Sequence, residues 1–167
     1  GRMTVVLPHG ALFRKGAEGK IRQALLEQDM LEAVIGLGGN IFYGTQLAAC
    51  LMVFKKVKDA DKKGKVLFID ASDQVRVGRA QSYLEPEHVN QIFEWFNNFD
   101  DVENYVKVAS KEDLKENDYN LNIPLYVEKI IEDNPPSVEE ALSDLKTAWK
   151  ESLEAEEKFK TILKDFV

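Results

Sequence analysis

Two short apolar runs on either side of a glycine-rich loop constrain the fold of this chain most strongly. Residues 31–37 and 47–54 are rich in bulky and β-branched side chains and are bounded by Gly and Asn, which is typical of buried strands rather than helices. Between the runs, residues 38–40 (Gly-Gly-Asn) tolerate a positive φ angle, and the loop is short enough for an antiparallel return. The sequence therefore predicts two neighbouring strands joined by a loop.

The loop carries two aromatic residues, Phe42 and Tyr43, where a solvated turn is normally polar. One interpretation is that both rings fold back as a lid on the core, because aromatic side chains are usually buried. The other is that the loop presents them for a function. The residues alone leave both interpretations open.

An apolar run at residues 3–7 is followed by Pro8 and His9. A strand that is apolar on both faces is typical of a central position in a parallel sheet, so we expect it to have partners on both sides. In open α/β sheets the carboxyl end of such a strand faces the ligand crevice, which makes Pro8 and His9 candidates for the crevice wall. The alternative for His9 is a hydrogen-bonded structural role, because no His, Cys or carboxylate at ligand spacing completes a metal site.

Residues 16–28 have helical spacing and connect the first strand to residues 31–37 as a crossover. The apolar face of this helix is predicted to comprise Ile21, Ala24, Leu25 and Gln28. A further apolar strand is predicted at residues 66–70, and the basic segment before it, residues 55–65, is either a phosphate-binding loop or a solvated turn. The single cysteine, Cys50, lies within an apolar run and is predicted to be a small buried hydrophobe.

The second half of the chain is predicted to be more helical. Pro86 suits a first helical turn, and residues 87–98 form an amphipathic helix. The apolar face of this helix comprises Val89, Ile92, Phe93, Phe96 and Phe99. Residues 101–132 are mixed and polar, and their pattern assigns no path to them beyond a turn-rich stretch before Pro124.

The segment Asn134-Pro135-Pro136 raises the question of catalysis, because Asn-Pro-Pro followed by an aromatic residue is the signature of DNA methyltransferases that act on exocyclic amines. Ser137 follows instead, and with Glu140 it forms the S-x-x-E pattern of a capping box. The sequence therefore indicates the start of a helix at Val138 and no catalytic motif.

This C-terminal helix, residues 138–166, carries an apolar seam with heptad spacing. The seam follows Leu142, Leu145, Trp149, Ser152, Glu156, Phe159, Leu163 and Phe166, with Ala148, Leu153 and Ile162 beside it. Either the seam packs on the chain's own domain, or it docks on the helices of a partner through Trp149, Leu153, Phe159 and Leu163.

The acidic composition limits contacts with nucleic acids. A formal charge of −7 repels phosphate backbones, so any such contact must be local or shared with a partner. No apolar run is long enough to span a bilayer and no signal peptide is visible, which makes the cytoplasm the expected location. The chain starts at Gly1 and enters a strand at once, so we expect a piece of a longer protein.

Several blocks together resemble the modification (M) subunit of type I restriction-modification systems. In order, they are residues 1–14 (GRMTVVLPHGALFR), 18–22 (EGKIR), 33–37 (AVIGL), 40–45 (NIFYGT), 65–72 (KVLFIDAS) and 119–124 (YNLNIP). The resemblance covers the chain to about Val127. Two departures are Gly38-Gly39, where relatives often carry Pro, and Leu125, where they commonly carry Arg.

The resemblance implies an adenine-specific DNA methyltransferase that uses S-adenosylmethionine and works with a specificity (S) subunit and, in the full complex, a restriction (R) subunit. It implies an α/β fold, namely the C-terminal portion of a Rossmann-like methyltransferase sheet, mixed and with an antiparallel strand, followed by a helical tail. The family's glycine motif for the cofactor and its catalytic motif precede the segment that corresponds to Gly1, so no catalytic residue is expected in this chain. By position, Phe42 is expected to stack on the flipped adenine, with Tyr43 as the second candidate.

The expected organisation has three parts. Residues 1–75 are the C-terminal half of the catalytic core, residues 76–133 a helical and irregular extension, and residues 134–167 a long helix for subunit contact. The competing hypothesis is a non-catalytic α/β module that only mediates protein association.

Overall fold

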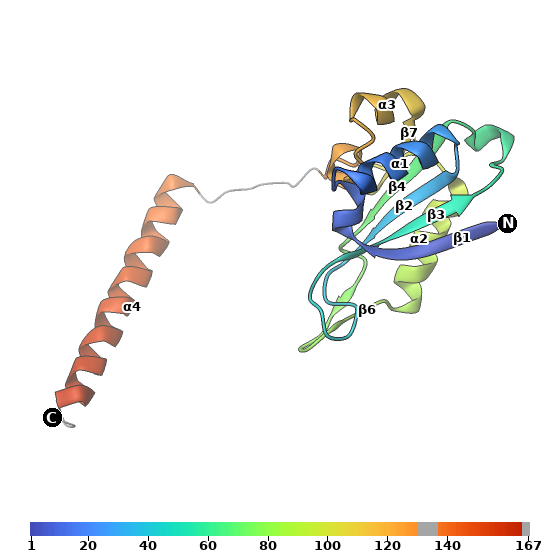
Figure 1. Cartoon of the computed structure of the whole chain (residues 1–167). Helices are drawn as coiled ribbons and strands as arrows, with labels where there is room; N and C mark the ends of the chain where they lie inside the picture. The colour runs from blue at the N-terminus through green and yellow to red at the C-terminus, as the bar shows by residue number, and fades with distance from the viewer. Residues whose placement is uncertain (130–136, 165–167) are drawn as a thin grey trace. The chain divides into compact units, whose positions relative to one another are not determined.

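The computed structural model describes residues 1–129 and 137–164. By internal contacts the chain divides into two units, residues 1–130 and 131–167. The first unit is a mixed α/β layer structure, and the second consists of a long helix (Figure 1).

A five-stranded sheet forms the centre of the first unit, with the strand order β1-β3-β2-β4-β7. The strands are β1 (Arg2–Pro8), β2 (Leu31–Leu37), β3 (Ala49–Lys55), β4 (Lys65–Ala71) and β7 (Val106–Ser110). β2 and β4 are parallel, β3 is antiparallel to both β1 and β2, and β7 is antiparallel to β4. The predicted mixed sheet with an antiparallel return after the glycine-rich loop is therefore confirmed.

The predicted central position of the first strand is wrong for the described chain. β1 lies at the end of the strand order and pairs with β3 alone, and its side chains Met3 and Val6 are exposed. An apolar pattern indicates which faces of a strand can be buried, but strand order depends on pairing with segments that are distant in sequence. β1 does run parallel to β2, as the predicted crossover requires, with β3 between them.

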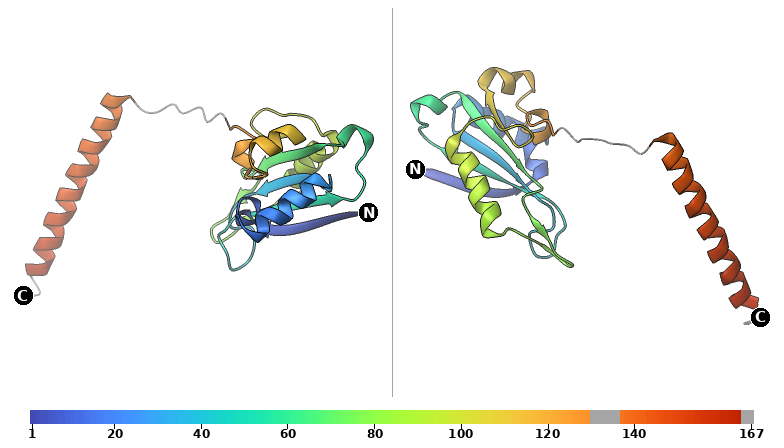
Figure 2. Two further views of the ribbon diagram at one scale, coloured as in Figure 1. Left: turned by 45° about the horizontal axis from the view of Figure 1, so that its top comes forward. Right: turned by 180° about the vertical axis from the view of Figure 1, so that it is seen from behind.

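Helices cover both faces of the sheet (Figure 2). α1 (Ala17–Glu27) packs on one face through Leu26, which joins a core cluster with Val34 and Phe68. α2 (Pro86–Asn98) packs on the other face through residues such as Trp95. Short 3-10 turns lie at His9–Leu12, Ala60–Lys62 and Ile123–Leu125.

Both helical faces differ in detail from the prediction. In α1, Ile21 is exposed and Arg22 is buried. The cost of burying the Arg22 guanidinium is offset by the hydrogen bonds that it donates to the carbonyl oxygens of Ala11 at 3.0 Å and Tyr119 at 3.4 Å. A buried cation with satisfied donors is invisible to a pattern that counts apolar residues. In α2 the buried face contains Trp95, whereas Val89 and Phe93 are exposed.

One lysine of the basic segment 55–65 is buried and paired, so the segment is not a fully solvated turn and this lysine cannot bind phosphate. Lys58 is buried, and its ammonium group lies 2.6 Å from Asp29 Oδ1 and 2.6 Å from the carbonyl oxygen of Lys65. This lysine joins the end of the α1 connection to the start of β4.

Residues 101–129, to which the sequence assigned no path, complete the sheet. β7 pairs with β4, α3 (Lys111–Glu116) follows with Ser110 as its N-cap, and Val127 joins the core. The expected boundary after residue 75 therefore falls inside the first unit.

The second unit contains α4 (Val138–Lys164), which starts where the sequence predicted. Its seam residues Leu142, Leu145, Trp149, Leu153 and Phe159 are all exposed. The side chains of Glu140 and Leu163, as well as Phe166 and the Asn134-Pro135-Pro136 segment, lie outside the described residues.

Candidate functional site at the carboxyl ends of the strands

The carboxyl ends of β1, β2 and β4 meet at one edge of the sheet, because these three strands run in the same direction. Pro8 and His9 end β1, the loop 38–48 follows β2, and Asp70 lies near the end of β4. This is the edge at which α/β sheets bind ligands. We call it the ligand edge.

A shallow apolar hollow of about 270 Å³ lies at the ligand edge. It is lined by Val6, Leu7, Pro8, Phe42, Thr45, Leu47, Ala48 and Ala49. The fold thus brings Phe42 and Pro8, two predicted site residues from separate segments, to the same hollow. Phe42 is 39% exposed, so its ring is partly packed and partly available.

Tyr43 lies outside this lining and is 97% exposed. The interpretation that both aromatics form a lid on the core is therefore wrong for Tyr43. Phe42 packs only in part, beside the end of β1.

His9 has a structural partner. Its Nε2 lies 3.0 Å from the carbonyl oxygen of Ala49, which is a lining residue of the hollow. The ring lies next to Gly36, where an added Cβ would be 3.7 Å from His9 Cε1. His9 is consequently held at the border of the hollow by a hydrogen bond rather than left free.

A small hairpin that the sequence did not predict holds the loop 38–48 in place. The hairpin consists of β5 (Arg76–Val77) and β6 (Ser82–Tyr83). Its Ser82 N–H donates to the carbonyl oxygen of Asn40 at 2.8 Å, and its Gln81 side chain donates to that of Ile41 at 2.6 Å. Asn40 itself adopts a positive φ of 59°, as the predicted turn requires. The short β-bridge leaves no alternating pattern long enough to detect from sequence.

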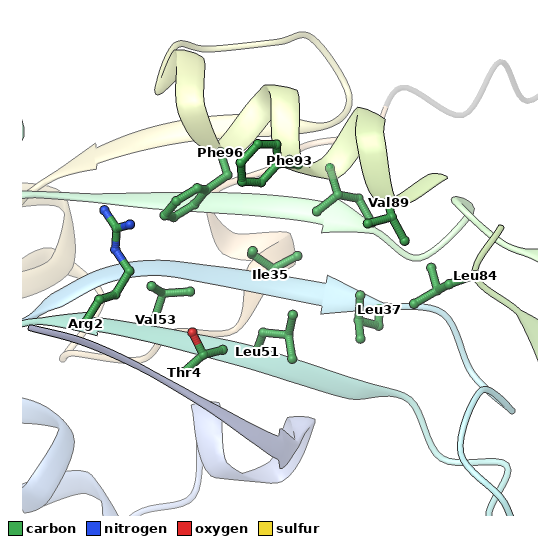
Figure 3. Close-up of a pocket in the computed structure, with 11 residues that line it drawn as sticks. Arg2, Thr4, Ile35, Leu37, Leu51, Val53, Leu84, Val89, Phe93 and Phe96 are labelled. Atoms are coloured by element: carbon green, nitrogen blue, oxygen red, sulfur yellow. The ribbon is translucent and has the colours of Figure 1, made fainter. Parts of the chain in front are cut away.

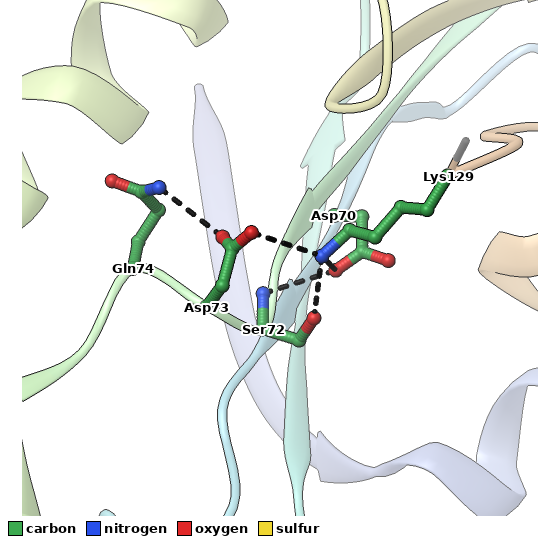
Figure 4. A network of polar contacts seen from close by, with 5 residues as sticks. All are labelled: Asp70, Ser72, Asp73, Gln74 and Lys129. Carbon is green, nitrogen blue, oxygen red and sulfur yellow. Dashed lines mark hydrogen bonds and ion pairs between the residues drawn. The ribbon is translucent and has the colours of Figure 1, made fainter. Parts of the chain in front are cut away.

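A polar network lies at the end of β4 (Figure 4). The Lys129 ammonium group is 3.2 Å from Asp70 Oδ1 and 3.3 Å from Asp73 Oδ2, and it donates to Ser72 Oγ at 2.9 Å. Gln74 donates to the other oxygen of Asp73 at 3.1 Å. Burial would raise the pKa of the Asp70 carboxyl group, but the hydrogen bonds from Ser72 and the charge of Lys129 outweigh burial and lower it. Asp70 is thus a paired carboxylate with no feature of a general base.

Cys50 is equally unsuited to catalysis. It is fully buried, its thiol donates to the carbonyl oxygen of Leu7 at 3.4 Å, and burial raises its pKa to about 11. A thiol of this kind is not ionised at neutral pH, in agreement with the predicted structural role.

A larger pocket of about 360 Å³ lies between α2 and the face of the sheet that this helix covers (Figure 3). Its lining is apolar apart from Arg2 and Thr4. The Arg2 guanidinium is already bound to Glu32, with Arg2 Nε 2.8 Å from Glu32 Oε2. The pocket therefore offers packing surface, as the exposed Phe93 at its rim also indicates.

Within residues 1–129 and 137–164, no group of three or more His, Cys, Asp or Glu side chains is arranged to hold a metal ion. In the same part of the chain, no helix is both long and apolar enough to cross a membrane.

Comparisons with known proteins agree on one family. The profile described as N-6 DNA Methylase matches residues 1–134. The MjaVII type I restriction enzyme methylase subunit of Methanocaldococcus jannaschii is 35% identical over 99% of this chain and 28% of its own length. The MpnII methylase subunit of Mycoplasma pneumoniae is 32% identical over 76% of this chain and 23% of its own length.

Solved structures give the same result. The crystal structure of a type I restriction-modification methyltransferase subunit from Streptococcus thermophilus is 42% identical, with a TM-score of 0.72 over 77% of this chain and 27% of that one. The EcoKI M protein, at 22% identity, shares the fold with a TM-score of 0.59 over 90% of this chain and 39% of that one. The chain thus spans less than a third of the length of the curated relatives that it matches.

Proposed function

This chain belongs to the N-6 DNA methylase family, and on that premise we propose that it is the C-terminal part of a type I modification subunit that methylates the exocyclic amine of adenine in DNA with S-adenosylmethionine. The relatives that support this proposal are methylase subunits of type I restriction enzymes. We expect the subunit to work in the cytoplasm, because that is where its DNA substrate lies.

The observation that carries the proposal is the hollow at the ligand edge, where the partly exposed ring of Phe42 lies beside Pro8. An enzyme that modifies a base inside a duplex must first turn that base out of the stack. An aromatic face that receives the base replaces part of the lost stacking energy, about 1–3 kcal/mol per base. In this proposal Phe42 receives the base, Pro8 forms the adjoining wall, and His9, bound to the carbonyl oxygen of Ala49, borders it.

Neither the hollow at the ligand edge nor the pocket under α2 fits S-adenosylmethionine on its own. The hollow is apolar, the pocket under α2 is apolar, and the Asp70 carboxylate at the ligand edge is occupied by Lys129. A charged, hydroxyl-rich cofactor needs polar partners. We therefore assign cofactor binding and the catalytic asparagine to the rest of the subunit, and we expect calorimetric titration of this chain alone with the cofactor to show no saturable binding.

The remaining surfaces suit contacts with that larger assembly. The exposed apolar side chains Met3 and Val6 on the free edge of β1 would be covered by further strands of the subunit. The seam of α4, with Trp149, Leu153 and Phe159 exposed, would dock on helices of the specificity subunit, and Leu163 extends it in sequence. The restriction subunit would join in the complete enzyme.

The test is Phe42→Ala in the intact subunit assembled with its specificity subunit. Methylation of a duplex substrate should fall, whereas melting should change little, because truncating a ring that is 39% exposed costs about 1–2 kcal/mol, below the cost of a fully buried Phe.

Tyr43→Ala is the matched control, since it removes a neighbouring aromatic that lies outside the hollow. Loss of methylation in Tyr43→Ala with normal activity in Phe42→Ala would contradict the assignment of the stacking residue. Normal activity in both variants would contradict the proposed role of the loop.

A further inference from the structure

We propose that the β5–β6 hairpin is a DNA-contacting arm, and that Arg79 at its tip binds a backbone phosphate of the duplex. This inference rests on the proposed function, because it places the arm beside the hollow for the flipped base. The hairpin itself contributes no residue to the lining of the hollow.

The hairpin ends in a tight two-residue tip. Arg76 pairs with Tyr83 and Val77 with Ser82, and the Gly78 N–H donates to the carbonyl oxygen of Gln81 at 3.0 Å. The register therefore leaves Arg79 and Ala80 as the turn. In Figures 1 and 2 the hairpin extends beyond the sheet alongside the loop between β2 and β3.

The core does not explain why the hairpin is there. Ser82 is the one buried residue between positions 76 and 83, and Val77 is 79% exposed. Two strands of two residues each are not stable by themselves in water. The hairpin is held instead by its hydrogen bonds to the loop 38–48.

These hydrogen bonds make the hairpin and the loop one body. The Ser82 and Gln81 bonds described above join the hairpin to Asn40 and Ile41. In addition, the Asn40 side chain donates to the carbonyl oxygen of Ala80 at 3.2 Å, directly beside Arg79. The tip is thus fixed relative to the loop that carries Phe42.

The two arginines of the hairpin, Arg76 and Arg79, differ in their partners. Arg76 forms an ion pair with Glu85 and lies over the Tyr83 ring at 4.7 Å, so it holds the base of the hairpin. Arg79 is exposed, and no carboxylate among the described residues forms an ion pair with it.

The exposed Arg79 guanidinium is suited to bind a phosphate from outside the chain, because no carboxylate of the described residues pairs with it. The chain as a whole carries a formal charge of −7, so a duplex can approach only where local charge permits it. Arginine recognises phosphate through paired N–H donors. Arg79 has no ion-pair partner among the described residues, and it lies on an arm that is hydrogen-bonded to the loop that carries Phe42, so it can supply such a site. A backbone contact of this kind positions the duplex without reading its sequence.

The experiment measures how DNA affinity depends on salt. The intact subunit, assembled with its specificity subunit, is titrated with a fluorescein-labelled duplex of mixed sequence at several salt concentrations, because phosphate contacts do not require the recognition site. Arg79→Ala should lower the slope of log affinity against log salt by about 0.9, the value for one lost phosphate contact. Arg79→Lys should keep the slope, because it keeps the charge.

Lys63→Ala is the matched control. Lys63 is exposed and lies in the connection between β3 and β4, at the sheet edge opposite the hairpin, so its loss should leave the slope unchanged. Equal slopes for Arg79→Ala and Lys63→Ala would overturn the proposal. Loss of assembly with the specificity subunit in Arg79→Ala would also overturn it and would identify the hairpin as a protein interface.

The outcome for the arm is separate from the outcome for the base hollow. Phe42→Ala should reduce methylation with the salt slope intact, whereas Arg79→Ala should change the slope. A wild-type complex that binds no DNA would contradict both proposals.

Discussion

Truncating Arg2 should destabilise the first unit by about 3 kcal/mol, because it leaves a carboxylate buried without a partner. The Glu32 side chain is 0% exposed and Arg2 is its cationic partner, with Nε to Oε2 at 2.8 Å and Nη2 to Oε1 at 3.2 Å. The pair crosses β3 and so ties the edge strand β1 to β2.

The magnitude follows from the two parts that Arg2 contributes. Removing one partner of a buried ion pair costs about 3–5 kcal/mol, and we take the lower end because the Arg2 side chain is 46% exposed and water can replace part of it. The guanidinium also lies 5.4 Å from the centre of the Phe96 ring, and the loss of this exposed cation–π contact, about 0.5–1 kcal/mol, is included in the total of about 3 kcal/mol. The Arg2→Ala, Glu32→Leu double variant should regain most of the loss, since it removes the stranded charge.

Urea denaturation followed by tryptophan fluorescence measures this loss. The chain has two tryptophans, so a Trp149→Phe background leaves the buried Trp95 as the reporter of the first unit. With a denaturant slope of about 1.5–2 kcal/mol per M, the Arg2→Ala midpoint should fall by roughly 1.5–2 M. A double variant whose loss equals the sum of the two single losses would contradict the coupling of Arg2 and Glu32, because independent groups give additive losses.

Three further predictions follow from other contacts. Lys129→Met should cost about 1–2 kcal/mol at neutral pH. The pKa of Asp70 is lowered in the folded chain, so the stability from this pair is present above the unfolded-state pKa of about 3.9 and is lost as the pH falls through the folded-state pKa. The urea midpoints of wild type and variant should therefore converge in acid. A difference between the midpoints that does not narrow would contradict the pairing. Trp149→Asp with Phe159→Asp should abolish pull-down of the specificity subunit with unchanged melting of the first unit, and assembly that survives would refute the docking role of α4. Cys50, whose pKa is about 11, should react with a thiol reagent at neutral pH only after urea is added, whereas rapid reaction of the folded chain would contradict its burial.

Local patterns in the sequence were sufficient for the strongly patterned elements. The apolar runs at β2, β3 and β4, Pro86 in the first turn of α2, and the capping-box pattern before Val138 each indicated an element that the structure contains. These features depend on residues that are close in the chain, and their spacing records which side is buried.

The missed features depend on partners that are distant in the chain. β7 is five residues long and is stabilised by pairing with β4, so its own pattern was too short to recognise. The burial of Arg22 and the Arg2–Glu32 pair likewise require contacts across the fold. A pattern of apolar residues carries no information about such polar pairs.

The candidate site was predicted in its parts but not in its assembly. Phe42 and Pro8 were chosen separately, the first from the family resemblance and the second from its place at the end of a strand. Their meeting at one hollow depends on β3, which brings the end of the loop back beside β1. The hairpin that fixes the loop was missed, because it is held by hydrogen bonds between side chain and backbone rather than by a buried face.

The most direct test of the central claim asks which residue touches the extruded base. The intact subunit and its specificity subunit are irradiated with a duplex in which 5-iodouracil replaces the target adenine, and the crosslinked residue is identified by mass spectrometry. We predict an adduct on Phe42 that Phe42→Ala removes. An adduct on Tyr43, an adduct outside residues 38–48, or full crosslinking in Phe42→Ala would contradict the claim that Phe42 receives the base.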